Sequence, residues 1–303
     1  MSFGSRQGFD EFSNEVVLLC QLSHPNLVPL IGYCMDEPEM ILVYEFMVNG
    51  NLHNHVYGTN NLDPLPWKKR LQICIGVARG LHYLHAGVKH SIIHRHVKLT
   101  NIILDEKWEA KLSDFGFSKM GPPSLSKEAL MSVESRLVGT PSYVAPEYAM
   151  RGEVSDKSDI YTFGVLLLEV LCDKKATYMT NLVILIQECI QKWTVNQIIN
   201  PYLMGKIAPE CFKIYMDIAT SCLRREGDER PTIGEVEVGL EHALELQDSA
   251  DLDPGIWSGD QYMYPILEYT RTDSPLEEEE SNSDSDSPRL SLASCPCTPP
   301  YGR

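Results

Sequence analysis

Residues 94–101 read HRHVKLTN, and this polar stretch decides the fold when it is taken with two motifs that follow it. Residues 114–116 are Asp-Phe-Gly and residues 145–147 are Ala-Pro-Glu. Short β-like apolar triplets at 102–104 and 110–112 separate the first motif from the second. Because the flanking segments are long and helical in pattern, we expect any chemistry to lie in this polar region.

Around these motifs, the apolar pattern predicts an α+β protein that is mostly helical. The apolar runs at 27–34 and 40–46 are separated by a polar Met-Asp-Glu-Pro-Glu turn and predict a β-hairpin. Apolar residues recur with a helical period in four further segments, at 9–22, 67–86, 158–172 and 210–224. The first of these helices should end before Pro25, which cannot continue a helix.

The three motifs occur in the order and at the spacings of protein kinases, and the chain resembles that family over about residues 7–245. Smaller details are similar to plant receptor-like Ser/Thr kinases with malectin-type ectodomains: LIGYC at 30–34, LVYEFM at 42–47, GLHYLH at 80–85, APEY at 145–148 and EVLC at 169–172. The resemblance implies a protein kinase-like fold, with a mainly helical large lobe and a truncated small β lobe.

We therefore expect three regions. Residues 1–62 would form a truncated small lobe of one helix, a hairpin and the hinge, and residues 63–247 the large lobe. Residues 248–303 would be a disordered, acidic, Ser-rich tail, because a run such as SPLEEEESNSDSDSP buries too little apolar surface to offset chain entropy. The whole chain has 26 Lys and Arg against 42 Asp and Glu, a formal charge of −16.

By resemblance, three residues would carry the chemistry of phosphoryl transfer from ATP. Asp114 would bind the Mg²⁺ that bridges the phosphates, and Asn101 would bind a second metal through its amide oxygen. Lys98 would neutralise charge on the transferred group. The sequence therefore keeps the family's Asp and Asn at the two metal-binding positions, 114 and 101.

The nucleotide itself would be held by the segment that follows the predicted hairpin. Tyr44 would lie behind the adenine pocket, and the backbone from Glu45 to Met47 would supply the hydrogen bonds that face adenine. Glu15 matches the family's helix Glu, whose partner is a Lys on the third strand. Because that Lys is missing, we expect Glu15 to lie instead on a solvated helix face.

Six further residues would support the scaffold. Asp159 resembles the family residue that holds the catalytic-loop backbone, and Glu147 with Arg230 resembles a buried ion pair. His94 and Phe115, together with Leu19, resemble the stacked apolar column that joins the two lobes. These side chains would fix geometry whether or not the protein is an enzyme.

Two departures from the family argue against catalysis. No G-x-G-x-x-G loop and no V-A-I-K Lys precede the first helix of this chain. The proton-acceptor Asp of the H-R-D motif is His96. An imidazole offers one lone pair and becomes cationic beside Lys98, so we expect a loss of roughly 10²–10⁴ in rate from this change alone. A milder departure, Pro141-Ser142 before Tyr143, affects the peptide-docking segment.

Arg95 is expected to have formed an ion pair with a phosphorylated residue of the activation segment, because a basic residue before the catalytic position pairs with phosphate in the family. The candidate sites are Ser132, Ser135 and Thr140.

The preferred function is therefore a pseudokinase that acts as a scaffold or interaction module for other receptor-like kinases or signalling proteins. ATP and Mg²⁺ binding would be weak or absent. The alternative is an active Ser/Thr kinase whose N-terminal strands are missing from this sequence, and a non-functional gene fragment is the third hypothesis.

The nine cysteines without C-x-x-C spacing indicate a reducing compartment, and we expect no structural zinc. The chain would lie in the cytoplasm, either free or held at the plasma membrane through a receptor complex.

The same composition excludes other classes. There is no basic stripe for nucleic acid. The longest apolar run, at 163–172, is too short to span a bilayer.

Overall fold

The computed structural model describes residues 6–36, 39–58, 63–123, 131–132, 143–174, 199–252 and 262. The expected phosphate sites Ser135 and Thr140, and nearly all of the expected tail, lie outside these residues. Helix α8 continues past Gln247 to Leu252, and Tyr262 is buried.

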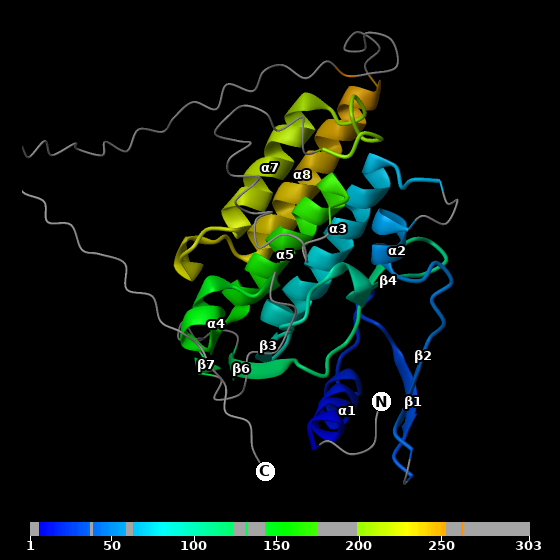
Figure 1. The fold of residues 1–303 in the computed structure, drawn as a ribbon, viewed down its shortest axis with the longest axis vertical. Helices are drawn as coiled ribbons and strands as arrows, with labels where there is room; N and C mark the ends of the chain where they lie inside the picture. Colours follow the sequence, from blue (N-terminus) through cyan, green and yellow to red (C-terminus); the bar gives the residue numbers. More distant parts are fainter. Residues whose placement is uncertain are drawn as a thin grey trace, which may run out of the picture. The chain divides into compact units, whose positions relative to one another are not determined.

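The chain begins with one helix and one hairpin, as the pattern predicts. Helix α1 (Arg6–Leu19) buries Phe12, Val16 and Leu19 on one face. It ends earlier than Leu22, because the amide of Gln21 bonds the carbonyl of Leu18 in a tighter turn. Strands β1 (Leu30–Cys34) and β2 (Ile41–Tyr44) pair antiparallel. Figure 1 shows the hairpin beside α1.

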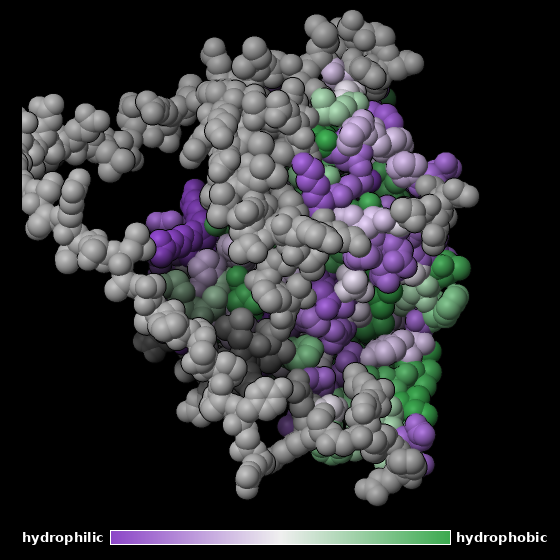
Figure 2. Space-filling model, in the orientation of Figure 1, coloured by the Kyte–Doolittle hydropathy of each residue, from purple (hydrophilic) through white to green (hydrophobic). Residues whose placement is uncertain are grey.

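The hairpin leaves apolar side chains in solvent. Ile31, Tyr33, Ile41 and Val43 are all about half or more exposed. Figure 2 shows hydrophobic side chains gathering along the edge of the molecule where β1 and β2 lie. A two-stranded hairpin is marginal by itself, so α1 and the rest of the core must supply its stability.

Four long helices form the main hydrophobic core, and neighbours in Figure 1 pack directly: α3 (Trp67–His82) on α8 (Ile233–Leu252), α8 on α7 (Pro209–Cys222), and α7 on α5 (Asp156–Cys172). Helix α5 is apolar nearly all round, which is the pattern of a helix buried on every side. Gly164 lets α5 approach α7 closely, because a Cβ there would lie 2.8 Å from the Cβ of Cys222. The predicted helices are thus present, and α3 ends in a single π turn (Tyr83–Gly87).

Short strands and helices fill the space between the hairpin and these four helices. The triplets of the sequence form β4 (Ile102–Leu104) and β5 (Ala110–Leu112), which pair antiparallel. Strand β3 (His90–Ile93) pairs with β6 (Lys119–Pro123), and β7 (Met131–Ser132) pairs with β8 (Glu153–Val154). The small helices are α2 (Leu52–Tyr57) and α4 (Pro146–Arg151). Consequently the loop at 94–101 joins β3 to β4 and the loop at 113–118 joins β5 to β6, so both polar loops connect the same two strand pairs.

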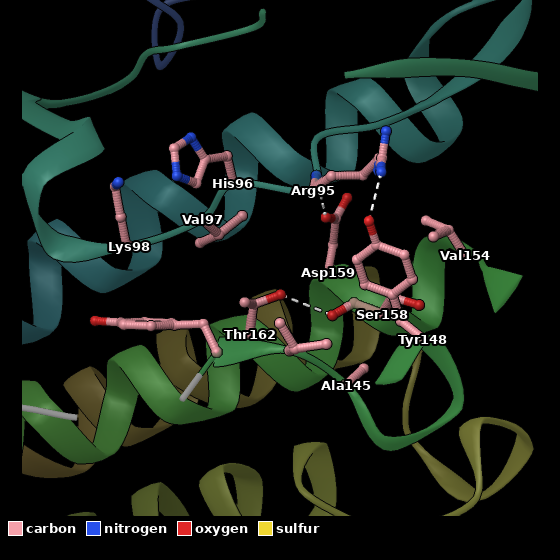
Figure 3. Close-up of a pocket in the computed structure, with 12 residues that line it drawn as sticks. Arg95, His96, Val97, Lys98, Ala145, Tyr148, Val154, Ser158, Asp159 and Thr162 are labelled. Carbon is pink, nitrogen blue, oxygen red and sulfur yellow. Dashed lines mark hydrogen bonds between the residues drawn. The ribbon is translucent and has the colours of Figure 1, made fainter. Parts of the chain in front are cut away.

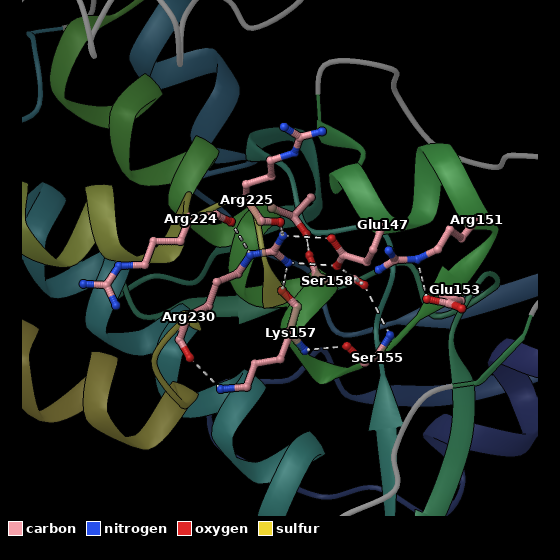
Figure 4. Close-up of polar contacts among 10 residues, drawn as sticks. Glu147, Arg151, Glu153, Ser155, Lys157, Ser158, Arg224, Arg225 and Arg230 are labelled. Carbon is pink, nitrogen blue, oxygen red and sulfur yellow. Dashed lines mark hydrogen bonds and ion pairs between the residues drawn. The ribbon is translucent and has the colours of Figure 1, made fainter. Parts of the chain in front are cut away.

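A buried ion pair ties α4 to the segment before α8. Arg230 donates from Nη1 and Nη2 to the two carboxylate oxygens of Glu147, at 2.8 Å each, and its side chain is 0% exposed (Figure 4). Ser158 donates to the same carboxylate. Burial would raise the pKa of Glu147, but the Arg230 guanidinium outweighs it and lowers the pKa below its usual value. The predicted pairing of these two residues is present in the fold.

We expect Arg230→Met to lower the free energy of unfolding by about 3–5 kcal/mol, because the Glu147 carboxylate would be left buried without its cation. Arg151→Met is the matched control, since Arg151 pairs with Glu153 at 2.8 Å on the surface (Figure 4). That change should cost about 0–1 kcal/mol. Urea unfolding of both variants tests this, and equal losses would contradict it.

Candidate functional site

The buried carboxylate of Asp159 organises the loop at 94–101. Asp159 lies in the first turn of α5, which Ser155 caps through a capping box with Ser158. Its two oxygens accept the amide protons of His94 and Arg95, both at 2.7 Å. The backbone of Arg95 is left-handed, with φ 66°, a conformation that costs a non-Gly residue energy unless its surroundings fix it. Asp159 therefore holds the turn that precedes position 96, in the way the sequence predicts.

The imidazole of His85, in the π turn that follows α3, also binds the Asp159 carboxylate. Nε2 of the buried residue His85 lies 2.9 Å from an oxygen of Asp159. No sequence motif singles out this residue. Its only signal is its place in GLHYLH, at the turn where the helical period ends.

His94 and Phe115 meet as the family resemblance implies. Their rings are in edge contact, with centroids 5.0 Å apart, and both side chains are fully buried. Burial lowers the pKa of His94 to about 4, so the imidazole is neutral at pH 7. Leu19 is buried in the same core cluster as Phe115. From α1, the amide of Asn14 donates to the carbonyl oxygens of Phe115, Gly116 and Ser118, which joins α1 to the 113–118 loop.

His96, Asp114 and Asn101 come together at the centre of the site. Nδ1 of His96 lies 2.7 Å from Oδ2 of Asp114, with side chains 13% and 35% exposed. This Nδ1 is shielded from solvent. The Asn101 amide donates to the backbone oxygen of His96 at 2.9 Å and to Oδ2 of Asp114 at 3.2 Å. These three residues of the expected site therefore lie in contact, and their roles stay a prediction.

The electrostatics of the centre favour an ionised Asp114. Burial acts to raise its pKa, but contact with His96 and the nearby His94 and Lys98 outweigh it, so the pKa lies below its usual value. Burial lowers the pKa of Lys98, and the charge of Asp114 acts in the opposite direction. Asp114 is also left-handed, with φ 68°.

Glu15 corrects the sequence analysis, because it is not on a solvated helix face. It is 4% exposed and accepts a hydrogen bond of 2.6 Å from the Tyr44 hydroxyl. Burial raises the pKa of Glu15, and the charge of Asp114 adds to this, while the Tyr44 bond acts against it. The expectation failed because it considered only a cationic partner. A phenol on β2 satisfies the carboxyl instead.

The segment after β2 has mixed exposure. The amide of Glu45 bonds the carbonyl of Pro29 at 3.3 Å, and the carbonyl of Met47 accepts from Gly50 at 3.1 Å. The Met47 side chain is buried, whereas Phe46 is 86% exposed. The adenine contacts expected from residues 45–47 stay a prediction.

A small pocket lies between the 95–98 loop and α5 (Figure 3). Arg95 points towards Tyr148 there and donates to its hydroxyl at 2.7 Å, and it also donates to the carbonyl of Phe117 at 3.0 Å. His96 and Lys98 project from the other side of the loop. Tyr143 also lines this pocket, and its hydroxyl and that of Tyr57 both donate to the buried carboxylate of Glu169, a cluster that no sequence motif predicts.

Comparison with known proteins agrees with this geometry. The family model described as protein tyrosine and serine/threonine kinase matches residues 3–240. The chain belongs to the protein kinase family. Its α+β, kinase-like fold is the one that the sequence predicts.

Curated relatives place the kinase domain among those of plant receptor-like kinases. The chain is 50% identical to the receptor-like protein kinase FERONIA of Arabidopsis thaliana, over 82% of this chain and 28% of the relative. It is 48% identical to ANXUR2, over 82% and 29%, and 46% identical to THESEUS 1, over 81% and 29%, both from the same plant. The chain spans less than a third of the length of these relatives. Within the described residues, no helix has the length and apolar character needed to cross a membrane.

The raised pKa of Glu15 predicts a pH-dependent stability. A carboxyl whose folded pKa exceeds its unfolded value of 4.5 stabilises the fold below that pH, and this contribution is lost as pH rises through the folded pKa. Glu15→Gln should therefore be more stable than the unmodified chain at pH 7, and the difference should close below about pH 4.5. Tyr44→Phe, which removes the donor, should lower stability at pH 7 by about 1–3 kcal/mol.

Urea unfolding between pH 4 and pH 8 measures these effects. Asp10→Asn is the matched control on the exposed face of the same helix, and its stability relative to the unmodified chain should not vary in the same way. A Glu15→Gln difference that is constant over this range would contradict the prediction.

Proposed function

We propose that this kinase-family chain is a pseudokinase that signals by association with other proteins and not by phosphoryl transfer. The observation that supports the proposal is the contact of 2.7 Å between Nδ1 of His96 and Oδ2 of Asp114. The substitution lies inside the chain, so the inference does not depend on where the sequence begins.

The chemistry at position 96 is unfavourable for transfer to a hydroxyl. In this position a carboxylate orients the acceptor hydroxyl and takes its proton. Nδ1 of His96 lies 2.7 Å from Oδ2 of Asp114 and is shielded from solvent, so it is not available for that proton. A protonated imidazole would place another positive charge beside Lys98, where magnesium is needed.

The residues present do not fit the two magnesium ions and ATP that the family implies. Magnesium binds through oxygen atoms in near-octahedral geometry. In this site the carboxylate oxygen Oδ2 of Asp114 is in contact with nitrogen atoms of both His96 and Asn101. Glu15, the family's partner for the phosphate-binding Lys, is bonded to Tyr44. We therefore propose that ATP and Mg²⁺ bind weakly or not at all.

The proposed partners and location of the chain rest on its similarity to the curated relatives. The relatives are receptor-like kinases, so we propose other receptor-like kinases or their signalling partners as the associated proteins, in the cytoplasm or at the plasma membrane. Residues 63–247 would form the associating large lobe, under a reduced small lobe at 1–62, with 248–303 as a tail. In this function the Asp159 and Glu147–Arg230 contacts keep the shape of a kinase without its activity.

The test is a radiolabelled-phosphate assay with MgATP and a generic Ser/Thr substrate. We expect no transfer from the 303-residue chain or from His96→Asp alone, because a base without a positioned phosphate has nothing to activate. Joining the first three strands of a relative's kinase domain ahead of Arg6, together with His96→Asp, should give measurable transfer, whereas the added strands alone should not. Asp114→Asn in each version is the control. Robust transfer by the unmodified chain that is lost in Asp114→Asn would overturn the proposal in favour of an active Ser/Thr kinase.

A further inference from the structure

Tyr262 lies against the last turn of α8 and is 3% exposed. Its amide donates to the carbonyl of Gly205 at 2.8 Å, and its hydroxyl donates to Oδ1 of Asp251 at 2.9 Å. Its side chain belongs to the main hydrophobic core cluster. The main chain, the ring and the hydroxyl of this one residue are therefore all in contact with the folded domain.

The groups that bind Tyr262 are held in place by other bonds. The side chain of Gln247, 1% exposed, accepts the amide proton of Ala208 at 2.8 Å and donates to Oδ1 of Asp251 at 2.8 Å. Gly205 is buried in a turn with φ 73°, a left-handed conformation that favours glycine. The Gln247 bonds join the 205–208 segment to α8 without using Tyr262, so the acceptors of its two hydrogen bonds are fixed beforehand.

We propose that this end of the domain is a docking site for a tyrosine, which holds the chain's own C-terminal segment through Tyr262 and releases it when that tyrosine is phosphorylated. The occupant is this chain, because its residue 262 is seated there. A tyrosine-directed protein kinase would transfer the γ-phosphoryl group of ATP to the phenol oxygen, which loses its proton, and ADP would leave. The inference does not depend on whether this chain is itself a kinase.

The chemistry of the site selects a tyrosine. Burial raises the pKa of the Tyr262 phenol, and the bond to Asp251 and the charge of that carboxylate add to this, so the hydroxyl keeps its proton at pH 7. A hydrogen bond to a carboxylate is stronger than one between neutral groups. Phenylalanine could fill the same volume, but it would leave Asp251 without this donor.

The same chemistry rejects a phosphate. A phosphotyrosine carries roughly −1.5 to −2 charges at pH 7, and beside an acidic side chain it disrupts a contact by repulsion and by the cost of desolvation. Asp251 would lie next to that phosphate. Nζ of Lys68 is 3.5 Å from Oδ2 of Asp251 and also pairs with Asp248. This cation is therefore already shared between two carboxylates.

Modification and docking exclude one another in time as well. A tyrosine that is 3% exposed cannot enter the active site of another kinase while it is docked. Phosphorylation therefore requires a local opening, in which the segment leaves the domain while the core stays folded. A phosphate added in that state would prevent the segment from docking again, so the released state would persist.

The first test measures the hydrogen exchange of the Tyr262 amide by NMR in the full chain. We expect this amide to be protected through its bond to Gly205. Tyr262→Phe should speed its exchange by about tenfold or more, because a hydrogen bond to a charged group is lost. Tyr262→Ala should remove the protection at position 262. Tyr269→Ala, which changes another tyrosine of the C-terminal segment, is the matched control and should leave the exchange of the Tyr262 amide unchanged.

The second test uses the full chain with phosphotyrosine placed at position 262 by synthesis. The amide of residue 262 should then exchange as fast as in Tyr262→Ala, whereas phosphotyrosine at position 269 should have no such effect. Asp251→Asn in the phosphorylated chain should restore part of the protection, because it removes one of the repelling charges. A phosphate that acted by its size alone would not respond to this change.

Three results would overturn the proposal: no protection of the Tyr262 amide in the unmodified chain, equal protection with and without the phosphate at 262, or equal loss from a phosphate at 269. Amides of α5 report whether each variant is folded. Because Tyr262→Phe keeps the ring, the comparison remains possible if the alanine variant does not fold. None of these measurements includes phosphoryl transfer by this chain, so their failure leaves the pseudokinase proposal to its own assay.

Discussion

One buried carboxylate holds the centre of this protein together. Asp159 is completely removed from water at the start of a helix that is itself buried, and a charge in that position is unfavourable unless it is fully hydrogen-bonded. Two main-chain amides and the ring of His85 satisfy it. In return, the carboxylate fixes the backbone of His94 and Arg95 in a conformation that the loop would not adopt alone. The geometry of position 96 is a consequence of this anchor.

The scaffold and the chemistry depend on different atoms of the same residues. At position 96 the contacts that hold the loop use the backbone: its amide donates to Nδ1 of His94 at 3.2 Å, and its carbonyl accepts from Asn101 at 2.9 Å. The side chain is not part of these bonds. A change from carboxylate to imidazole can therefore alter the reactivity of the site while the fold is kept. The same reasoning explains how a family can contain members that retain the shape of a kinase and differ in what they bind.

Sequence reasoning was most successful where one physical rule acts alone. The apolar period predicts α3, α5 and α7, because each must bury its apolar surface. The ordered motifs assign His96, Asn101 and Asp114 to one expected site, and the structure brings these three side chains together. Sequence reasoning failed where tertiary packing alone brings two distant segments into contact. Tyr44 and Glu15 lie 29 residues apart, and no local pattern connects a phenol on a strand with a carboxyl on a helix. The early end of α1 and the π turn after α3 depend on backbone bonds that a periodic pattern does not resolve.

The partners of Arg95 have one further consequence. Its guanidinium is bonded to the carbonyl oxygen of Phe117 and the hydroxyl of Tyr148, and both groups are uncharged. Attraction between two full charges at a protein surface weakens as mobile ions accumulate, over a screening distance of about 8 Å at physiological ionic strength. A short bond from a cation to a neutral dipole is far less affected by dissolved ions. The loop at 94–101 should therefore keep the same shape in dilute buffer and in concentrated salt.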